Sequence, residues 1–156
     1  MEFSDVIKNR YSCKKFSSEQ IGKDKLDAIL EAGRVAPTAK NLQEQHIYVV
    51  QSESALETID KLTPCRYNAP TVLIVAFNKN NVFTYPGDKR NSGIEDATIV
   101  ATHLMLAACN EGVDSCWINF FNPDELAKAF NLPEDEEILM LLDLGIADQT
   151  TTPLPN

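Results

Sequence analysis

The segment Ile94–Glu111 constrains the fold more than any other, because its apolar residues recur with a helical period over a long run. Its middle part, Ile99–Cys109, is apolar on nearly all sides, so we expect a helix that runs through the core. Gly112 follows at a position where helices commonly end. An apolar fraction of 44% is ordinary for a globular protein, so the chain can bury such a helix without disulfides or a structural metal.

The remaining apolar patterns predict shorter helices and strands. Helical spacing occurs near Phe3–Ile7 and over residues 23–35, before any strand, and Ser52 and Asn122 are suited to cap two further helices. The expected strands are His46–Gln51, Thr71–Phe77, Ser115–Phe120 and Ile138–Gly145. Two helices ahead of the first strand do not fit a plain doubly wound fold. We therefore expect one α+β domain over residues 1–156, with a mixed, mainly antiparallel sheet flanked by helices and a long buried central helix.

Charge is distributed unevenly along the chain. The formal net charge is −9; residues 1–90 carry 13 basic and 11 acidic side chains, whereas residues 91–156 carry one basic residue, Lys128, and 12 acidic ones. A nucleic-acid surface is not expected, because neutralising phosphates requires a concentrated basic face. Any anionic ligand should be met mainly by residues 1–90. No apolar run is long enough to span a membrane and no signal peptide is evident, so a cytoplasmic protein is predicted.

Motifs for metal, nucleotide and catalytic-triad chemistry are missing from the sequence. The four cysteines form no C-x-x-C pair, and with the two histidines they show no zinc spacing, so no metal site is expected. The six glycines form neither a G-x-G-x-x-G motif nor a phosphate-binding loop. We expect the cysteines to be free thiols in a reduced compartment. Thiol redox chemistry between Cys109 and Cys116, at a helix end and in the next strand, stays open as an alternative.

The stretch Arg10–Phe16 is the part of the sequence that most suggests a ligand. It follows the first short helix and places two cations and a hydroxyl at alternating positions. An extended backbone directs alternate side chains to one side, so Arg10, Ser12 and Lys14 are able to face one ligand. A guanidinium, a hydroxyl and an ammonium suit an anionic ligand with a polar ring or sugar. On spacing alone, a solvated basic turn between two helices explains the same pattern.

Five segments of the chain match signatures of one protein family. Arg10–Phe16 resembles the signature R-x-S-x-[RK]-x-F, and Ala32–Gln43 resembles the signature A-x-x-A-P-S-x-x-N-x-Q. Asp96–Trp117 is similar to a central helix with the pattern D-x-x-I-A-x-x-x-L-x-L-A-A-x-x-x-G-x-x-x-x-W, and Asn68–Phe77 and Leu132–Gly145 resemble two strands of the same family. These segments follow one another in the family's order over about residues 3–147, and together they resemble the nitroreductase family of FMN-dependent oxidoreductases.

The resemblance implies a homodimer that binds FMN in each of two clefts between the subunits. It places Arg10 at the phosphate, Ser12 at the ribityl or phosphate oxygens, and Lys14 near the N1/O2 edge of the flavin. It places Pro37–Asn41 at the flavin bound mainly by the partner, and Cys116–Asn119 beside the isoalloxazine ring. The implied cofactor-binding residues are Arg10, Tyr11, Ser12, Lys14, Pro37, Thr38, Ala39, Asn41, Cys116, Trp117, Ile118 and Asn119. No side chain is implied as catalytic, because the chemistry takes place on FMN.

The implied activity is reduction of nitroaromatic, quinone or similar acceptors by NAD(P)H in a ping-pong cycle. The alternative is a flavin-binding family member with little or no turnover. Lys128 is the only cation after Arg90, so a basic phosphate contact that is common near the family's C-terminus is missing. We hypothesise that Lys40 of a second copy, or Arg66, replaces this contact.

Overall fold

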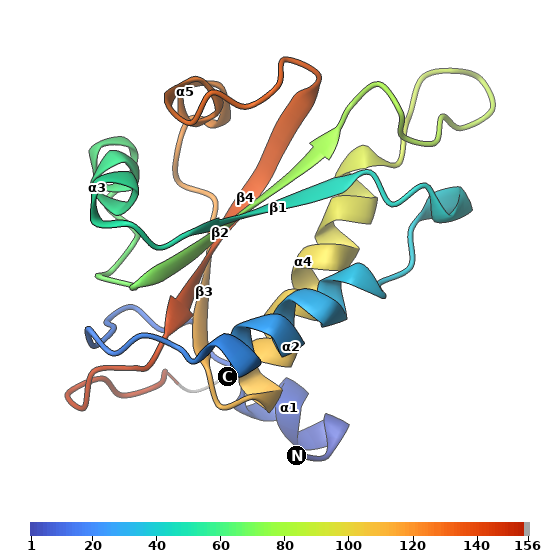
Figure 1. The fold of residues 1–156 in the computed structure, drawn as a ribbon. Helices are drawn as coiled ribbons and strands as arrows, with labels where there is room; N and C mark the ends of the chain where they lie inside the picture. The colour runs from blue at the N-terminus through green and yellow to red at the C-terminus, as the bar shows by residue number, and fades with distance from the viewer. Residues whose placement is uncertain (155–156) are drawn as a thin grey trace.

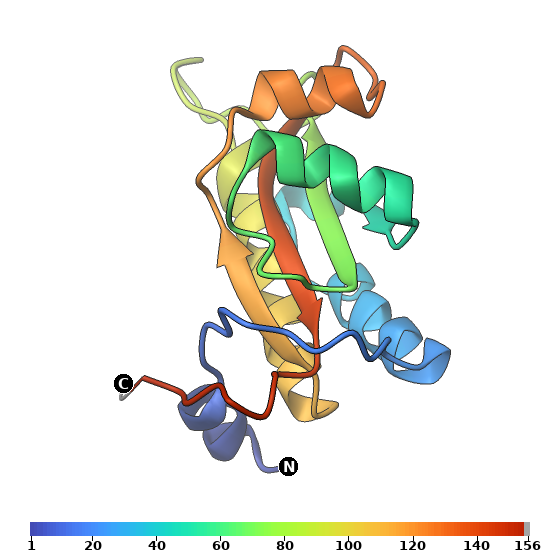
Figure 2. The same ribbon diagram turned by 90° about the vertical axis from the view of Figure 1, so that its left-hand side faces the viewer.

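A four-stranded sheet in the order β1-β2-β4-β3 separates two groups of helices (Figures 1 and 2). The computed structural model describes residues 1–154. Its strands are β1 (Gln45–Val50), β2 (Thr71–Asn78), β3 (Asp114–Ile118) and β4 (Glu136–Gly145). Its α-helices are α1 (Phe3–Asn9), α2 (Lys23–Arg34), α3 (Glu53–Leu62), α4 (Gly93–Asn110) and α5 (Pro123–Ala129), and Ala39–Asn41 form the short 3-10 helix η1. The expected order of helices and strands, and the α+β class, are confirmed.

Local sequence signals account for several of these boundaries. The hydroxyl of Ser52 accepts a hydrogen bond from the Ala55 amide at the start of α3. The side chain of Asn122 accepts bonds from two amides at the start of α5, where Pro123 occupies the first turn. Gly112 adopts a φ of 71° directly after α4, a conformation that glycine takes without steric cost. All three pairings between neighbouring strands are antiparallel.

The two central strands are buried on both faces, and each face has its own core. On one face, strand residues such as Leu73 and Leu142 pack against α2 and α4. On the other face, strand residues such as Ile74 and Leu141 pack with Ile59 of α3 and with α5. A strand that is covered on both faces has apolar residues at successive positions. This explains why apolar and polar residues do not alternate in Thr71–Phe77.

Helix α4 buries only one face within the protomer. Val100, Leu104 and Ala108 are buried, whereas Ile94 is 61% exposed and Ile99 is 37% exposed. The expected burial of this helix in the core is therefore confirmed for the face that packs with the sheet and α2, and it is wrong for the face that carries Ile94 and Ile99. At Gly33 of α2, an added Cβ would lie 2.7 Å from the Leu104 side chain, so the two helices pack closely.

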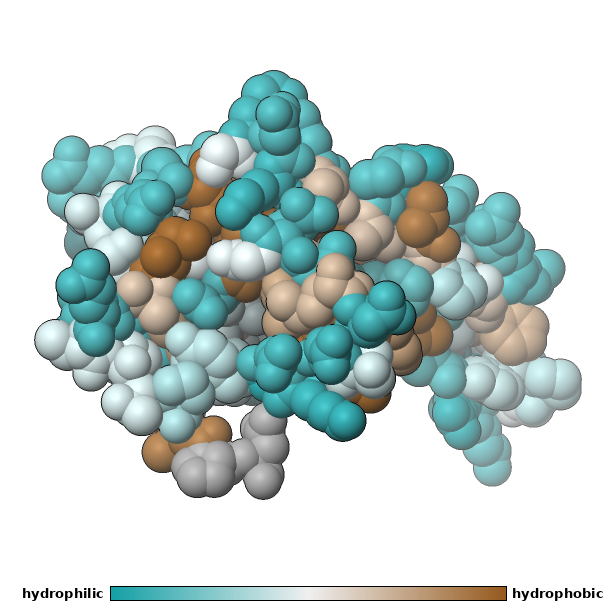
Figure 3. All heavy atoms as spheres, turned by 90° about the horizontal axis from the view of Figure 1, so that it is seen from below, coloured by the Kyte–Doolittle hydropathy of each residue, from teal (hydrophilic) through white to brown (hydrophobic). Residues whose placement is uncertain are grey.

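The open face of α4 forms an apolar groove with α1. Its volume is about 570 Å³, and its lining includes Phe3, Ile99, His103 and Leu106. Seen from the end of the molecule that carries the N-terminus, hydrophobic side chains gather in separate patches between hydrophilic ones (Figure 3). None of the helices among residues 1–154 combines the length and the apolar character needed to cross a membrane.

Strand β4 carries a buried carboxyl group that the sequence pattern did not reveal. Asp143 lies between Val72 of β2 and Cys116 of β3, and it is 0% exposed. Neither of its side-chain oxygens has a hydrogen-bond partner among the described residues. Burial raises the pKa of Asp143 to about 9, although the nearby charge of Arg66 opposes the shift. The carboxyl is therefore held in its neutral form at pH 7.

We predict that Asp143 makes the folded state less stable as the pH rises from about 4 to about 9. An unfolded aspartate releases its proton near pH 3.9, whereas the folded one keeps it until about pH 9, so the unfolded state is favoured progressively between these values. The isosteric variant Asp143→Asn should lose this slope and gain stability relative to wild type at pH 8, on the order of 3 kcal/mol.

Urea unfolding at several pH values between 5 and 9 measures this effect. Asp148→Asn is the control, since the Asp148 carboxyl bonds to Thr150 and the pKa of Asp148 is lowered by those bonds. Its unfolding curve should follow the wild-type pH dependence. Parallel pH dependences for wild type and Asp143→Asn would contradict the account of the buried acid.

Candidate cofactor site

The first half of the candidate site is the extended segment that follows α1. Ser12 and Lys14 are exposed and Arg10 is half-buried, whereas Cys13 between them is fully buried. Burial therefore alternates over Ser12, Cys13 and Lys14, whereas Tyr11 is half-buried like Arg10 and Lys15 is exposed like Lys14. The amide of Cys13 donates to the Ser115 carbonyl at 2.8 Å, and Ser12 forms a parallel bridge with Ser115. Strand β3 thus holds the backbone of this segment at Ser12 and Cys13.

The C-terminal segment holds the same stretch from its other side. The Ser17 amide donates to the Ile146 carbonyl at 2.8 Å, and the Asp148 amide donates to the Lys15 carbonyl at 3.0 Å. The Lys15 ammonium donates to the Thr150 hydroxyl at 2.8 Å. The Lys15 ammonium thus interacts with the C-terminal segment of its own chain. Lys14 is therefore the better candidate of the two for a ligand contact.

The predicted segment Cys116–Asn119 begins directly after Ser115, the residue of β3 that pairs with Ser12 and Cys13. The side chains of Cys116 and Ile118 are buried on the α3 and α5 side of the sheet, at 5% and 4% exposure. Trp117 packs toward the α4 core instead, and its indole nitrogen donates to the Asn119 side chain at 2.8 Å. Because Cys116 and Ile118 point into the core, they would offer a ligand mainly their backbone groups.

The predicted residues Pro37, Thr38, Ala39 and Asn41 lie elsewhere, at the opposite end of α4. The Ala39 amide donates to Asp96 in the first turn of this helix at 2.9 Å. Arg10, by contrast, borders a small cavity with Cys109 and Gly112 at the last turn. Eighteen residues of α-helix span about 27 Å. One protomer therefore does not bring the Pro37–Asn41 turn to the Arg10–Lys14 segment.

Arg66 is committed to neighbours within its own chain. Its Nε and Nη2 donate to the Asp60 carboxylate at 2.7 and 2.6 Å, and its Nη1 donates to the Ala69 carbonyl at 2.7 Å. These bonds hold three of the five N–H donors of the guanidinium within its own chain, so the structure disfavours Arg66 as the replacement contact. Lys40 is exposed on the Pro37–Asn41 turn. It is the better of the two hypothesised contacts.

Cys13, Cys109 and Cys116 do not have the environment of reactive thiols. Burial raises the pKa of Cys116 to about 12, and burial also raises the pKa of Cys13 and of Cys109. The thiolate is the reactive form, so these shifts disfavour nucleophilic or redox chemistry. Cys116 lies in the core beneath α3 and α5, whereas Cys109 belongs to α4 on the other face of the sheet. The structure therefore does not support the alternative of thiol exchange between Cys109 and Cys116.

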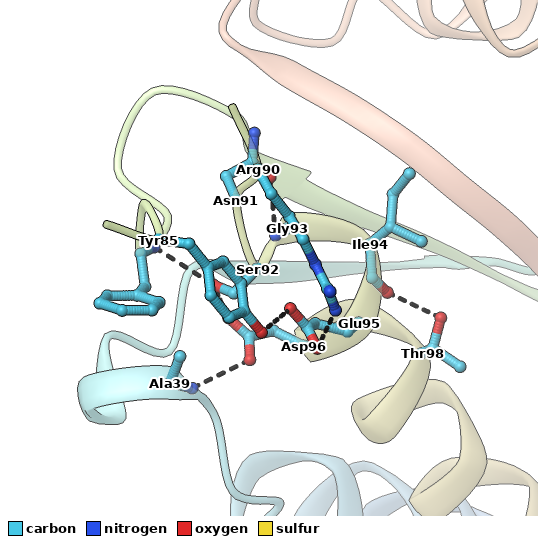
Figure 4. A network of polar contacts seen from close by, with 11 residues as sticks. Ala39, Tyr85, Arg90, Asn91, Ser92, Gly93, Ile94, Glu95, Asp96 and Thr98 are labelled. Atoms are coloured by element: carbon cyan, nitrogen blue, oxygen red, sulfur yellow. Dashed lines mark hydrogen bonds and ion pairs between the residues drawn. The ribbon is translucent and has the colours of Figure 1, made fainter. Parts of the chain in front are cut away.

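A polar network at the start of α4 was missed by the sequence analysis (Figure 4). Asp96 is buried and joins the Pro37–Asn41 turn to Ser92, whose hydroxyl donates to it at 2.6 Å. Beside it, the Tyr85 hydroxyl donates to Glu95 at 2.5 Å, and the Arg90 guanidinium lies 4.6 Å from the centre of the Tyr85 ring. Two signals were available, since Asp96 opens the central-helix signature and also begins the i+4 series of buried residues Val100 and Leu104.

Comparison with known proteins identifies the family. A profile of the nitroreductase family matches residues 7–65 and 64–146, so the chain belongs to the nitroreductase family. The "Putative NAD(P)H nitroreductase YodC" of Bacillus subtilis (strain 168) is 28% identical, over 92% of this chain and 88% of that protein. The resemblance noted from the sequence motifs is thereby confirmed.

Solved structures of the same fold agree with this assignment. A nitroreductase family protein from Clostridium difficile 630 is 33% identical with a TM-score of 0.93, over 99% of this chain and 88% of that chain. A nitroreductase crystallised in complex with FMN, from Exiguobacterium sibiricum 255-15, is 21% identical with a TM-score of 0.87, over 100% of this chain and 93% of that chain. At that identity the likeness concerns the fold alone.

We predict that Cys13 and Cys116 react with a thiol reagent only after unfolding. Both are buried and both have raised pKa values, so the native protein at pH 8 presents neither access nor thiolate. Mass spectrometry after brief alkylation, with and without denaturant, locates the modified residues. Rapid native labelling of Cys116 would contradict this description and reopen the thiol alternative.

Proposed function

We propose that this chain is an FMN-dependent oxidoreductase whose cofactor is held at Arg10, Ser12 and Lys14. The observation that carries the proposal is the exposure of Ser12 and Lys14 on either side of the buried Cys13, in a segment whose backbone pairs with Ser115 of β3. A guanidinium, a hydroxyl and an ammonium fit the phosphate, the polyol chain and the electron-rich edge of a flavin. Family membership supports the same reading, and structures of this fold from Exiguobacterium sibiricum and Bacteroides fragilis contain FMN.

Each residue has a distinct role in this proposal. Arg10 donates paired hydrogen bonds to the phosphate, a geometry that a planar guanidinium favours. Ser12 donates to an oxygen of the phosphate or of the ribityl chain. Lys14 places a fixed positive charge near the N1/O2 edge, where it stabilises negative charge without any movement of a proton. FMN, when bound, supplies the hydride chemistry, so the chain needs no acid–base side chain of its own.

We further propose a homodimer in which the open faces of α4 meet. The groove of Phe3, Ile99 and Leu106 is apolar, and a two-fold interface would cover it with the same groove of a second copy. If the two α4 helices run in opposite directions, the Pro37–Asn41 turn of one protomer approaches Arg10 and Lys14 of the other. The two halves of the site, the Arg10–Lys14 segment and the Pro37–Asn41 turn, lie at opposite ends of α4 in one protomer. A complete site therefore requires a dimer.

The proposed substrates are NAD(P)H and a nitroaromatic, quinone or similar acceptor, which use one site in turn. The sequence has no dinucleotide-binding motif, which suits brief contact of the nicotinamide over the cofactor. Relatives named as NAD(P)H nitroreductases support the same substrate classes. One observation favours the alternative of a flavin-binding protein with little turnover. Arg66 and Lys15 form hydrogen bonds within their own chain, so neither is available to strengthen the hold on the phosphate. A cytoplasmic location and a single domain stay predictions.

We predict that Arg10→Ala weakens FMN binding by about 10- to 100-fold, the loss expected for a charged hydrogen-bond donor. Fluorescence titration of FMN with the purified protein gives the dissociation constant. Lys61→Ala on α3 removes the same charge at a distant exposed position and should leave the affinity unchanged. Equal affinities for wild type and Arg10→Ala would remove the proposed phosphate contact.

Turnover separates the two functional alternatives. The FMN-loaded wild type should oxidise NADH or NADPH steadily when a quinone is supplied, with parallel lines in a double-reciprocal analysis of a ping-pong enzyme. Followed by absorbance, an FMN-loaded protein without NAD(P)H oxidation would favour the binding-protein alternative. A protein that binds no FMN would contradict both.

We predict that Ile99→Glu converts the dimer to monomers, because it would place a carboxylate in the apolar groove between subunits. The same variant should lose FMN affinity, since each site needs both protomers. Sedimentation velocity gives the oligomeric state, and Ser54→Glu on the exposed surface of α3 is the charge-matched control. A wild-type protein that sediments as a monomer would refute the dimer.

A further inference from the structure

The Pro37–Asn41 turn has an unfavourable backbone that something outside it must hold. Lys40, Asn41 and Gln43 all adopt a φ between 52° and 54°, in the left-handed region. A side chain with a Cβ is disfavoured in this region, so a turn with three such residues persists only when its surroundings enforce it. The sequence contains no glycine at these positions that would relieve the cost.

The turn's own hydrogen bonds do not supply this enforcement. The Asn41 amide donates to the Thr38 carbonyl at 3.0 Å, and the Gln43 amide donates to the Thr38 hydroxyl at 3.1 Å, both within the turn. Among the hydrogen bonds described for residues 37–43, the bond from the Ala39 amide to Asp96 is the one that reaches another element. Its acceptor is a carboxylate that is 4% exposed on the rigid helix α4.

The second oxygen of Asp96 anchors the loop that precedes α4. Oδ1 accepts the Ala39 amide, and Oδ2 accepts the Ser92 hydroxyl at 2.6 Å. The Ser92 hydroxyl oxygen in turn accepts the Phe83 amide at 3.2 Å. Figure 4 shows Asp96 between Ala39 on one side and Ser92 on the other. The Asp96 carboxylate therefore fixes the position of the Pro37–Asn41 turn relative to the loop that carries Phe83.

We propose that Asp96 is the positioning residue of the partner-facing half of the cofactor site. This inference rests on the proposed flavin site between two protomers. Asp96 touches neither cofactor nor substrate; it holds the Pro37–Asn41 turn in the shape that meets the cofactor bound by the other protomer. It also sets the loop of Phe83 and Tyr85 beside that turn, so the two segments present one surface to the acceptor.

Two substitutions at position 96 test the proposal. Asp96→Ala removes both acceptors, and FMN affinity should fall at least about tenfold, with the dimer retained in sedimentation velocity. Asp96→Asn keeps a side-chain oxygen for the Ala39 amide and a group that pairs with the Ser92 hydroxyl, so its affinity should return to within about threefold of wild type. Ser52→Ala, which removes the cap of α3, controls for a general loss of stability and should bind FMN normally.

A double-mutant cycle tests the specific bond. Ala39→Pro deletes the amide donor, and it suits the backbone because Thr38 already has φ −132° and ψ 159°, the region preferred before proline. If Asp96 acts through its hydrogen bond to the Ala39 amide, removing both partners should cost no more FMN affinity than removing one. The double variant Ala39→Pro with Asp96→Ala should then have the affinity of whichever single variant binds FMN more weakly. Additive losses would overturn the proposal.

The outcomes also separate this inference from the proposed function. Wild type that binds FMN while a dimeric Asp96→Ala protein binds it equally well overturns the positioning role and leaves the flavin function intact. Wild type that binds no FMN overturns the proposed function, and the positioning role is then overturned with it. Should Asp96→Ala fail to fold, the Ala39→Pro and Asp96→Asn variants decide the question through their FMN affinities.

Discussion

The packing of α4 against the sheet and α2 is the contact on which the rest of the structure depends. An added Cβ at Gly33 would lie 2.7 Å from the Leu104 side chain, so a larger residue there would force Leu104 to move, and α2 and α4 pack closely at this point. The turn after α2 is then held at the first turn of α4 through Asp96. The extended segment with Arg10 lies at the helix's other end, beside β3. The helix therefore sets the spacing between the two half-sites.

Much of the fold was predictable because its signals are local. Helical spacing, the caps Ser52 and Asn122, and the apolar run Thr71–Phe77 identified the elements and their order. The exposure of one face of α4 was not predictable, since residues such as Ile99 look the same whether their own chain or another copy covers them. A hydropathy pattern predicts that a surface is buried, but it does not predict which element or which chain buries it.

Some features of the candidate site could likewise be predicted from the sequence, and others could not. The exposure of Ser12 and Lys14 on either side of the buried Cys13 follows from an extended backbone and could be predicted from the sequence. The commitment of Arg66 to Asp60, six residues away, and the anchoring of Ala39 by Asp96, 57 residues away, depend on tertiary geometry. The buried Asp143 also escaped notice, because a lone acid within a strand pattern gives no sign of lacking a partner.

The central claim, that each cofactor site combines Arg10 of one protomer with the Pro37–Asn41 turn of the other, is tested most directly by mixed dimers. One differently tagged protomer carries Arg10→Ala, and the other carries Thr38→Ala and Asn41→Ala. A mixed dimer then contains one site with all the substitutions and one site with none. We predict that it binds one FMN per dimer at wild-type affinity, whereas both parent homodimers bind weakly. A mixed dimer with two weak sites would contradict the account.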